Sequence, residues 1–586
     1  MATTPVTSAR VEFPPEALRN YALIADGERG ALCGPNGDLV WLCAPRWHDD
    51  AVLSTLIGGR GVYAVTPVGR YAWGGHYEHG TLIWRNRWVT DADAVVECRD
   101  ALPLPADPKR VTVLRRIEGR SGRSRLRLVL DLRAGFGRHP MRDPRLVDGV
   151  WTASSGDLKL RWTGAAEASV DERGRLAAEI ALAAGETREL VLEVGPDLAE
   201  PVNAQTAWAR TEREWHEAVP PFDRCIAPRD TRHAYAVLRG LTSATGAMVA
   251  AATMSLPERA DAGANYDYRY AWIRDQCLAG LAISADGPHP LLHDAVSFVT
   301  ARLLEHGSDL KPAYLIDGGT VPDEEPVDLP GYPGGSDVRG NAVGRQFQLD
   351  TMGEILLLLA AAARHELLDA DGWSAARLAA EVIEKRWTEP EAGIWELDDA
   401  WWTHSRLACV AGLRAAAEIS PRSDQGRMSA LADTVLAETS RRCVHRDGHW
   451  QRRPDDPRVD AALLLPLLRG ATPPDDPRTA ATLDAVRRDL VHDEYVYRYR
   501  HEGHELGEGE GAFLLCGFVV ALSEAQQGNS VAALRAFERN RAATGPPALL
   551  AEEFDVEQRQ LRGNLPQAFV HALLLESAVR LADLAG

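Results

Sequence analysis

The sequence lacks the long apolar run that a membrane-spanning helix needs, since no stretch of about 18 apolar residues occurs in the chain. Its N-terminal stretch MATTPVTSARVEFPPEALRN also lacks the apolar centre of a secretory signal peptide. The eight cysteines form no C-x-x-C pair and mostly have apolar neighbours, as in FLLCGF, so we expect reduced core residues. These absences predict a soluble cytoplasmic protein.

Positive charge is in short supply. The chain has 65 Lys and Arg against 84 Asp and Glu, a formal net charge of -19, which disfavours nucleic acids and anionic membranes as partners. The net charge does not disfavour uncharged ligands. At 586 residues, 45% hydrophobic and 25% charged, the composition is that of a globular protein with two or more domains, or one large domain with an appendage.

Several motifs of nucleotide, serine-hydrolase and metal chemistry are missing. We find no P-loop and no G-x-S-x-G elbow. The run GEGEGA at 507–512 does not match G-x-G-x-x-G and follows no clear strand. In HEGHE at 501–505 the histidines are three residues apart, whereas a zinc-protease helix needs them four apart. We therefore expect no metal and no organic cofactor.

What is present in the first third of the chain is a series of short β-type runs separated by turn residues. The pair Asn36-Gly37 is the preferred two-residue hairpin turn and precedes an apolar strand. This pattern, which extends to about residue 197, indicates a β-sandwich. The runs are ALIAD, GALCG, LVWLCA, GVYAVTP, TLIWRNRWV, AVVECRDAL, RVTVLRRIE, RLRLVLDL, GVWTAS, LKLRWTG, LAAEIALA and RELVLEVG.

The remainder of the chain is helical. A helix over 203–219 leads to PPFDRCIAPRD, whose proline steps indicate a linker. About twelve helical patterns follow, which form six hairpins in a closed double ring, with the long connections gathered at one end. We place a β-sandwich domain with its linker helix at residues 1–220 and an (α/α)6 barrel at 221–586. The helical patterns cover approximately 230–244, 274–285, 290–306, 346–368, 373–387, 403–419, 425–443, 459–468, 479–490, 511–527, 530–543 and 564–584.

Four connections carry unusual numbers of aromatic and charged residues. The first is NYDYRYAWIRDQ at 265–276, the second spans 314–346, the third is GIWELDDAWWTHSR, and the fourth is LLAEEFDVEQRQLRGNLPQAF. Aromatic rings stack on the apolar faces of a sugar, while carboxylates and arginines bond its hydroxyl groups. The composition of these connections therefore predicts a sugar site.

The ordered motifs resemble those of glycoside hydrolase family 15, the group of glucoamylases, trehalases and glucodextranases. The resemblance covers nearly the whole chain. It implies an N-terminal β-sandwich, an (α/α)6 barrel, and inverting, exo-acting hydrolysis of α-glucosides that releases β-glucose from the non-reducing end. The motifs are YALIADGERGALCGPNGDLVWLCAPRWHDDAVL, ATMSLPE with NYDYRYAWIRD, LPGY to GNAVGRQFQLD, GIWEL with THS, YRYR with EGAFLLCGF, and AEEFD with GNLPQAF.

The resemblance also implies roles for single residues. The glutamate of GIWEL, Glu396, corresponds to the general acid, and the first glutamate of AEEFD, Glu552, corresponds to the general base. For Glu510 and for Glu553 a structural role is the stronger interpretation. The residues that match substrate-binding positions of the family are Trp272, Arg274, Asp275, Trp395, Arg498 and Glu510.

Elementary electrostatics agrees with different protonation states for the proposed acid and the proposed base. Burial against a ring such as Trp395 would favour a protonated acid, and polar, solvated surroundings would keep the base ionised. The substrate is a small oligosaccharide or disaccharide, with trehalose, maltooligosaccharides and α-1,6-linked glucosides all open. The stretch GGSDVRGNAV is shorter than the family pattern and Pro326 stands where Leu is expected, so the choice of leaving group stays open.

Two other functions are weighed against hydrolysis. A glycoside phosphorylase of related fold keeps only the acid and needs a phosphate pocket in place of the base, where the two carboxylates of AEEFD would repel phosphate. A catalytically retired sugar-binding protein is marked by loss of the acid or the base, and Glu396 and Glu552 are both present.

Overall fold

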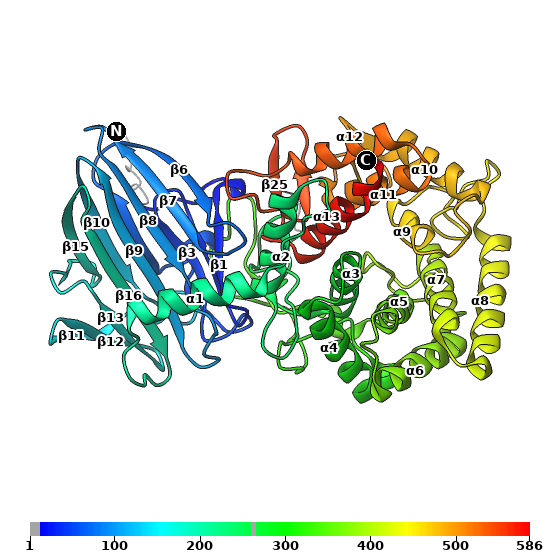
Figure 1. The fold of residues 1–586 in the computed structure, drawn as a ribbon, viewed down its shortest axis with the longest axis horizontal. Helices are drawn as coiled ribbons and strands as arrows, with labels where there is room; N and C mark the ends of the chain where they lie inside the picture. Colours follow the sequence, from blue (N-terminus) through cyan, green and yellow to red (C-terminus); the bar gives the residue numbers. More distant parts are fainter. Residues whose placement is uncertain (1–11, 260–264, 586) are drawn as a thin grey trace, which may run out of the picture.

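The computed structural model describes residues 12–259 and 265–585 (Figure 1). The first eleven positions, which belong to the stretch compared with a signal peptide, lie outside the described residues. A β-sheet domain and a ring of helices lie side by side, joined by the long helix α1 (Ala204–Ala218). In the part that is described, no helix combines the length and apolar character needed to cross a membrane.

The N-terminal part is a sandwich of two antiparallel sheets of eight strands each. One sheet has the order β1-β2-β3-β5-β10-β15-β14 with β4 beside β3, and the other has the order β11-β12-β13-β16-β9-β8-β7-β6. The predicted sandwich is confirmed. The strands are β1 (Ala22–Ala25), β2 (Gly30–Cys33), β3 (Asp38–Cys43), β4 (Ala51–Leu53), β5 (Val62–Pro67), β6 (Tyr71–Tyr77), β7 (Trp84–Thr90), β8 (Val95–Ala101), β9 (Val111–Ser121), β10 (Arg123–Asp131), β11 (Arg142–Val147), β12 (Val150–Ser155), β13 (Leu158–Thr163), β14 (Ser169–Val170), β15 (Leu176–Ala183) and β16 (Thr187–Gly195).

The hairpin predicted at Asn36-Gly37 joins β2 to β3. Gly37 has φ +67°, a left-handed conformation that favours glycine, and a side chain there would meet the carbonyl of Val65. The strands without a sequence prediction are the short β4 and the edge strands β6, β11 and β14. Edge strands carry a weak apolar signal because they pack against the core on few sides.

The helical part is the predicted (α/α)6 barrel. Six inner helices contact one another in a closed ring, and six outer helices surround them. The sequence boundary at residue 220 falls between α1 and α2, and it stays a prediction. The inner helices are α3 (Ile273–Ser284), α5 (Asp350–Arg364), α7 (Thr403–Ile419), α9 (Leu464–Leu468), α11 (Leu514–Gln526) and α13 (Ala568–Arg580); the outer ones are α2 (Pro228–Leu241), α4 (Pro290–His306), α6 (Ala370–Arg386), α8 (Arg422–Cys443), α10 (Pro477–Leu490) and α12 (Ser530–Arg541).

Four inner helices, α5, α9, α11 and α13, begin later than their sequence patterns indicate. For α9 and α13 the reason is that polar residues at their predicted starts serve the loops instead. Asp460 caps a 3-10 turn by accepting a hydrogen bond from Ala462 N at 2.9 Å, so α9 itself is only five residues long. Asn564 accepts from Thr253 Oγ1 at 2.9 Å and donates to the carbonyl of Tyr266 at 2.8 Å. The last predicted helix therefore begins at Ala568, and its end is the separate α14 (Ala582–Ala585).

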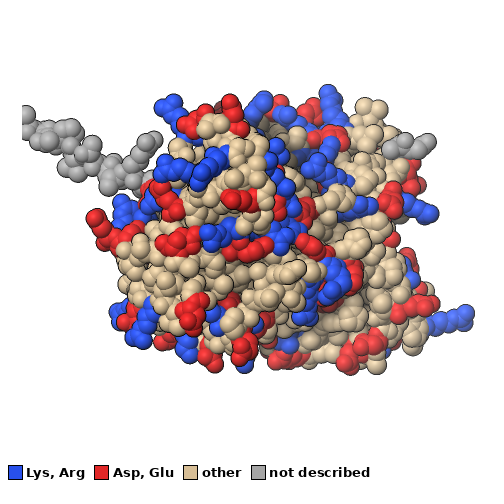
Figure 2. Space-filling model, turned by 60° about the vertical axis from the view of Figure 1, so that its left-hand side comes forward, with Lys and Arg blue, Asp and Glu red and all other residues tan. Residues whose placement is uncertain are grey.

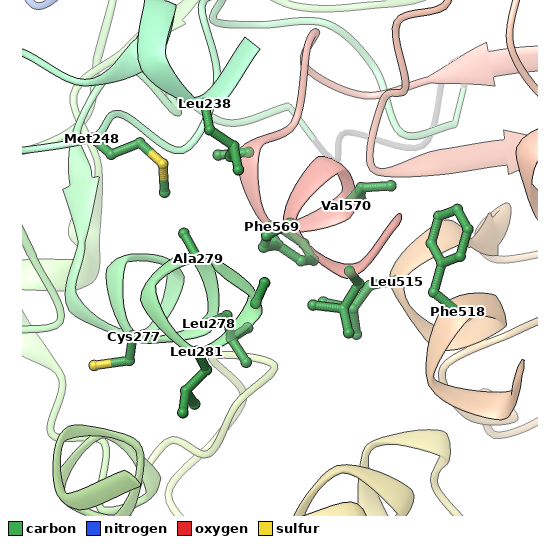
Figure 3. Packing of buried hydrophobic residues seen from close by; sticks show 14 of the residues in the cluster. Leu238, Met248, Cys277, Leu278, Ala279, Leu281, Leu515, Phe518, Phe569 and Val570 are labelled. Carbon is green, nitrogen blue, oxygen red and sulfur yellow. The ribbon is translucent and has the colours of Figure 1, made fainter. Parts of the chain in front are cut away.

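Apolar side chains pack between the helices of the barrel (Figure 3). Leu238 of α2, Leu278 of α3, Phe518 of α11 and Phe569 of α13 are all buried in one core cluster. Burying such a side chain contributes about 1.5–3 kcal/mol. The eight cysteines are free and seven of them are buried, as expected of core residues.

Charged side chains cover the surface in a mixed pattern. Figure 2 shows Lys and Arg interspersed with Asp and Glu on one face, without a broad field of one sign. Many of them pair, as Arg125 does with Glu179 at 2.6 Å. This face therefore offers no continuous basic stripe of the kind that binds nucleic acids.

Candidate active site

A pocket of about 380 Å³ lies at the end of the barrel where the long connections meet. Its walls come from all four connections that the sequence singles out and from the segment 498–513 between β22 (Tyr495–Val496) and α11. The structure thus brings the sequence-predicted site residues together in one place. They are Glu396, Glu552, Trp272, Arg274, Asp275, Trp395, Arg498 and Glu510.

The segment 265–272 is extended, and its side chains point alternately toward the pocket and toward the β-sandwich. Tyr266, Tyr268 and Trp272 line the pocket, and the ring centroids of the two tyrosines are 6.1 Å apart in a stacked arrangement. Asp267 and Arg269 between them are buried on the side of the β-sandwich. The buried face carries the charged Asp267 and Arg269, while the aromatic face is open at Tyr266, which is 39% exposed. The strand is therefore not visible in the sequence as apolar residues alternating with polar ones.

Arg269 connects this segment to the β-sandwich. Its guanidinium pairs with Asp267 at 2.7 Å and donates to the backbone carbonyls of Trp47 at 3.2 Å and Asp49 at 2.8 Å. The Tyr270 hydroxyl donates to the same Asp267 carboxylate at 2.9 Å. These bonds fix the backbone that carries the pocket tyrosines against a loop of the other domain.

Arg274 and Asp275 form the deepest polar part of the pocket, in the first turn of α3. The Asp275 side chain is 0% exposed, and its Oδ2 accepts from Arg274 Nε at 3.2 Å. Its Oδ1 has no hydrogen-bond partner within the described ranges, which leaves one acceptor for a ligand. Burial raises the pKa of Asp275 to about 6, against the opposing charge of Arg274. Arg274 also donates to the carbonyl of Ile394 at 2.7 Å.

Glu396 lies at the mouth of the pocket, on the loop between α6 and α7. Its backbone has φ +55°, an uncommon conformation for a residue with a side chain, and such strain occurs most often at functional sites. Its Oε1 accepts from Trp272 Nε1 at 2.7 Å, with Arg274 Nη1 at 3.4 Å. The side chain is 23% exposed.

The neighbouring Trp395 is held differently from what the sequence suggests. Its Nε1 donates to both oxygens of the Asp460 carboxylate, at 3.0 and 3.1 Å, instead of facing Glu396. The loop itself is braced by the buried Glu391, which accepts from Gly393 N at 2.7 Å and pairs with Arg406 at 2.8 Å. The hydrogen bond to Glu396 therefore comes from Trp272 and not from Trp395, and burial of the acid against the ring of Trp395 stays a prediction.

Glu552 lies deeper than Glu396, just before β24 (Glu553–Asp555), and is 6% exposed. Burial and the adjacent carboxylate of Glu258 raise the pKa of Glu552 well above its usual range. The expected solvated setting for this residue is therefore wrong. Its neighbour Glu553 lies outside the lining of the pocket. Glu553 accepts a hydrogen bond from Gly511 N at 2.7 Å and approaches Arg498 at 3.9 Å, which supports a structural role for Glu553.

Arg498 and Glu510 form an ion pair in the wall of the pocket, with Nε to Oε2 at 2.9 Å. His501 Nε2 lies 3.1 Å from the same carboxylate oxygen. Although burial acts against ionisation, Arg498 and His501 hold the pKa of Glu510 below its usual range. His504 lies beside Glu508 at 3.6 Å, and the HEGHE run is not helical, so the rejected zinc motif is not assembled.

A second, open groove of about 530 Å³ begins at Glu396. It shares Gln346, Leu397, Tyr499 and His501 with the pocket and continues over the surface. Glu396 thus stands between an inner pocket, which ends at a fully buried Asp275, and an outer groove. The other residues that line the groove are Asp398, Trp402, Arg452, Arg453, Asp456, Arg458, Arg500 and Glu502.

Sequence reasoning missed several residues that line the pocket. Glu258 is the last residue of the ATMSLPE motif and has no role predicted from the sequence, although a charged residue after an apolar stretch and a proline is a usable signal. Tyr266 and Tyr268 belong to the aromatic stretch that predicted the site, but neither was singled out. The other missed residues include Glu324, Asn341, Gln346, Tyr499, Phe513, Gln567 and Phe569.

Comparison with known proteins agrees with this architecture. The profile of "Glycosyl hydrolases family 15" matches residues 232–579, and that of "Trehalase-like, N-terminal" matches residues 14–215. The first covers more than half of the chain. The two matched ranges correspond to the barrel and to the sandwich with most of α1.

Single proteins match over long stretches. Trehalase of Mycobacterium tuberculosis is 29% identical over 638 aligned positions, covering 99% of this chain and 91% of the relative. Isomaltose glucohydrolase of Kribbella flavida is 28% identical over 355 positions, covering 58% of this chain and 83% of the relative. The crystal structure of a bacterial glucoamylase complexed with acarbose superposes with a TM-score of 0.70 at 13% identity, covering 97% of this chain and 96% of that chain.

The fold and the family match define the class of the protein as a glycoside hydrolase. The chain belongs to glycosyl hydrolase family 15. The family predicted from the sequence motifs is thereby confirmed, and so is the fold that it implies.

Proposed function

We propose that the protein is an inverting, exo-acting α-glucoside hydrolase. The observation that carries the proposal is the position of Glu396 between a closed pocket and an open groove, with Glu552 as a second carboxylate inside the pocket. A terminal glucose occupies the pocket, where Oδ1 of Asp275 and the guanidinium of Arg274 bind its hydroxyl groups. The leaving group occupies the groove. An enzyme with such a closed inner pocket cuts from a chain end.

Glu396 acts as the general acid and Glu552 as the general base. Trp272 already donates to Oε1 of Glu396, so Oε2 is the oxygen that carries the proton to the glycosidic oxygen. Glu552 takes a proton from a water molecule, whose oxygen attacks the anomeric carbon from the opposite face. Arg274 and Asp275 stabilise the developing oxocarbenium-like ring through hydroxyl contacts that tighten in the transition state.

Trehalose is the substrate that we propose to test first. Its support is the similarity of nearly the whole chain, including the sandwich, to a protein named trehalase. Maltose and isomaltose stay in the comparison, because Kribbella flavida isomaltose glucohydrolase matches the barrel region as well. The predictions of a cytoplasmic location and of catalysis without a cofactor are kept as part of this proposal.

The anomer released first tests the mechanism. An inverting enzyme converts α,α-trehalose into one molecule of β-glucose from the pocket and one of α-glucose from the groove. A retaining enzyme releases α-glucose only. Proton NMR in the first minutes, before mutarotation, should show equal α and β signals. An initial spectrum of α-glucose alone would reject Glu552 as a general base.

The same reaction mixtures separate hydrolysis from its alternatives. Trehalose, maltose and isomaltose are each incubated with and without inorganic phosphate. Free glucose alone supports a hydrolase, and a glucose phosphate would identify a phosphorylase. Binding without turnover of any of them would identify a retired sugar-binding protein.

A further inference from the structure

Glu258 is a buried carboxylate in the wall of the pocket that the proposed mechanism does not use. It is 8% exposed and lines the same pocket as Glu552. The backbone positions it, since Gly563 N donates to the carbonyl of Pro257 at 2.9 Å. A side chain placed on Gly563 would touch Glu552 Cβ at 3.6 Å and Glu258 Cγ at 3.7 Å, so both glutamates pack on this glycine.

The side chains of Glu258 and Glu552 lie beside one another at Gly563, where an added Cβ would be 3.7 Å from Glu258 Cγ and 3.8 Å from Glu552 Oε2. Tyr268 donates its hydroxyl to Oε1 of Glu258 at 3.4 Å. Oε2 of Glu552 is buried and accepts no bond from the N–H and O–H groups of the described residues. Two carboxylates in contact repel one another strongly when both are charged, so a single proton between them is the favourable state.

The surroundings supply too little positive charge to ionise both groups. Arg498 lines the same pocket, but its guanidinium bonds Glu510 at 2.9 Å and also approaches Glu553 at 3.9 Å. The charged and titratable groups that face the pair are Tyr266, Tyr268, Arg274, Asp275, Arg498, His501, Glu510 and Glu553. Among them the carboxylates outnumber the arginines.

We propose that Glu258 and Glu552 work as one base: Glu258 keeps a proton and donates it in a hydrogen bond to one oxygen of Glu552, so that the other oxygen stays charged for the attacking water. Glu258 is then a positioning residue for the reaction. The inference rests on the function proposed above. It explains how Glu552, although buried among other carboxylates, can be ionised and therefore accept a proton from the water.

The proton balance of one turnover is complete within this arrangement. The water oxygen forms the bond to the anomeric carbon while its proton passes to the charged oxygen of Glu552. The bond to the leaving oxygen breaks as that oxygen takes the proton of Glu396. Afterwards solvent removes the extra proton from the glutamate pair and returns one to Glu396, which restores the starting state.

The test is the pH dependence of kcat/KM on trehalose for the wild type and for Glu258→Gln. Glu258 is neutral in the singly protonated pair, so the replacement removes no charge there, but the amide is a weaker donor than the carboxylic acid and Glu552 becomes harder to ionise. We expect activity within about tenfold of the wild type at the optimum, and an acidic limb that moves up by about one pH unit or more. An acidic limb that does not move would overturn the proposal.

Glu553→Gln is the matched control, because it removes a buried carboxylate of the same cluster that bonds the backbone of Gly511. It should move the acidic limb much less than Glu258→Gln. Equal shifts would mean a general field effect and would reject the shared proton. Loss of nearly all activity in Glu258→Gln, with Glu552→Gln only mildly affected, would make Glu258 itself the base.

A measurement without turnover separates this inference from the proposed function. In ¹³C NMR of protein labelled at the glutamate carboxyls, the wild type should show a neutral carboxyl near neutral pH that disappears in Glu258→Gln. Its absence overturns the shared proton whatever the substrate is. Failure of the wild type to hydrolyse any of the three disaccharides, with this signal present, overturns the proposed function alone. Thermal melts establish that each variant is folded.

Discussion

Replacement of Asp275 by asparagine tests the bottom of the pocket with little change in shape. The aspartate offers two acceptors, of which Oδ2 serves Arg274 at 3.2 Å and Oδ1 is left for a sugar hydroxyl. The amide has one acceptor oxygen, so it can serve either Arg274 or the sugar. The variant therefore loses one charge-assisted hydrogen bond, worth about 1.5–3 kcal/mol.

At about 1.36 kcal/mol per factor of ten, this loss lowers kcat/KM on trehalose by roughly 10- to 150-fold. Most of the loss should appear in kcat, because the hydroxyl contacts tighten as the ring approaches the transition state. Initial rates of glucose release at pH 7, over a range of trehalose concentrations, separate the two constants. A normal kcat with only a raised KM would refute the reasoning and leave Asp275 as a ground-state binding residue.

Asp476→Asn is the matched control for this experiment. Asp476 caps α10 and bonds Arg478 at 2.9 Å, so it is also an aspartate at a helix start beside an arginine. It lies outside the lining of the pocket. Asparagine caps a helix as well as aspartate does, so the replacement loses only the ion pair with Arg478, should cost about 0–1 kcal/mol of stability, and should leave kcat/KM unchanged. A similar catalytic loss in both variants would show that Asp275 acts through the stability of its helix.

Three further predictions concern the acid, a buried glutamate and the contact between the domains. Glu396→Gln should lower kcat on trehalose by about 10²–10⁴-fold and lower the rate on α-glucosyl fluoride far less, because fluoride leaves without a proton; equal losses would mean that Glu396 is not the acid. Burial raises the pKa of Glu354 from 4.5 to about 7, so ionisation of this residue lowers the free energy of unfolding as the pH rises through that range. Glu354→Gln should therefore raise the free energy of unfolding at pH 8 by up to about 3 kcal/mol, seen as a higher melting temperature, and should not raise it at pH 4. A gain of the same size at both pH values would contradict this assignment. Arg269→Gln removes the partner of a buried Asp267 and should lower stability by about 3–5 kcal/mol, seen as a lower melting temperature, whereas an unchanged melting curve would show that the contact is dispensable.

The sequence predicts the fold because each domain repeats a simple pattern. Strand runs bounded by turn residues, such as Asn36-Gly37, and apolar spacing in the helices depend on local preferences and burial, which are readable along the chain. The ends of elements are less readable. Asp460 and Asn564 look like parts of helices, but their side chains are used by loops that contact residues more than thirty positions away.

The residues of the pocket are predictable where they belong to motifs, and their electrostatic settings are not. The motifs predict Glu396 and Glu552, but the solvated surroundings expected for Glu552 are wrong. Trp272, 124 positions away, donates to Glu396, and Glu258 comes from another segment to pack beside Glu552 at Gly563. A pKa depends on neighbours brought together by the tertiary fold, which a local pattern does not contain.

The contacts of Arg269 with the β-sandwich have a consequence for exchanging domains between members of the family. The carbonyls that it binds belong to Trp47 and Asp49 of the sandwich, while its own backbone holds Tyr268 in the pocket wall. A barrel produced alone would present an arginine that has lost these two carbonyl acceptors, in the segment that carries Tyr268 of the pocket wall. A chimaera with a foreign sandwich would need a loop of the same shape at 45–50. The β domain therefore supports the pocket wall of the barrel, and an exchange of either domain has to keep this contact.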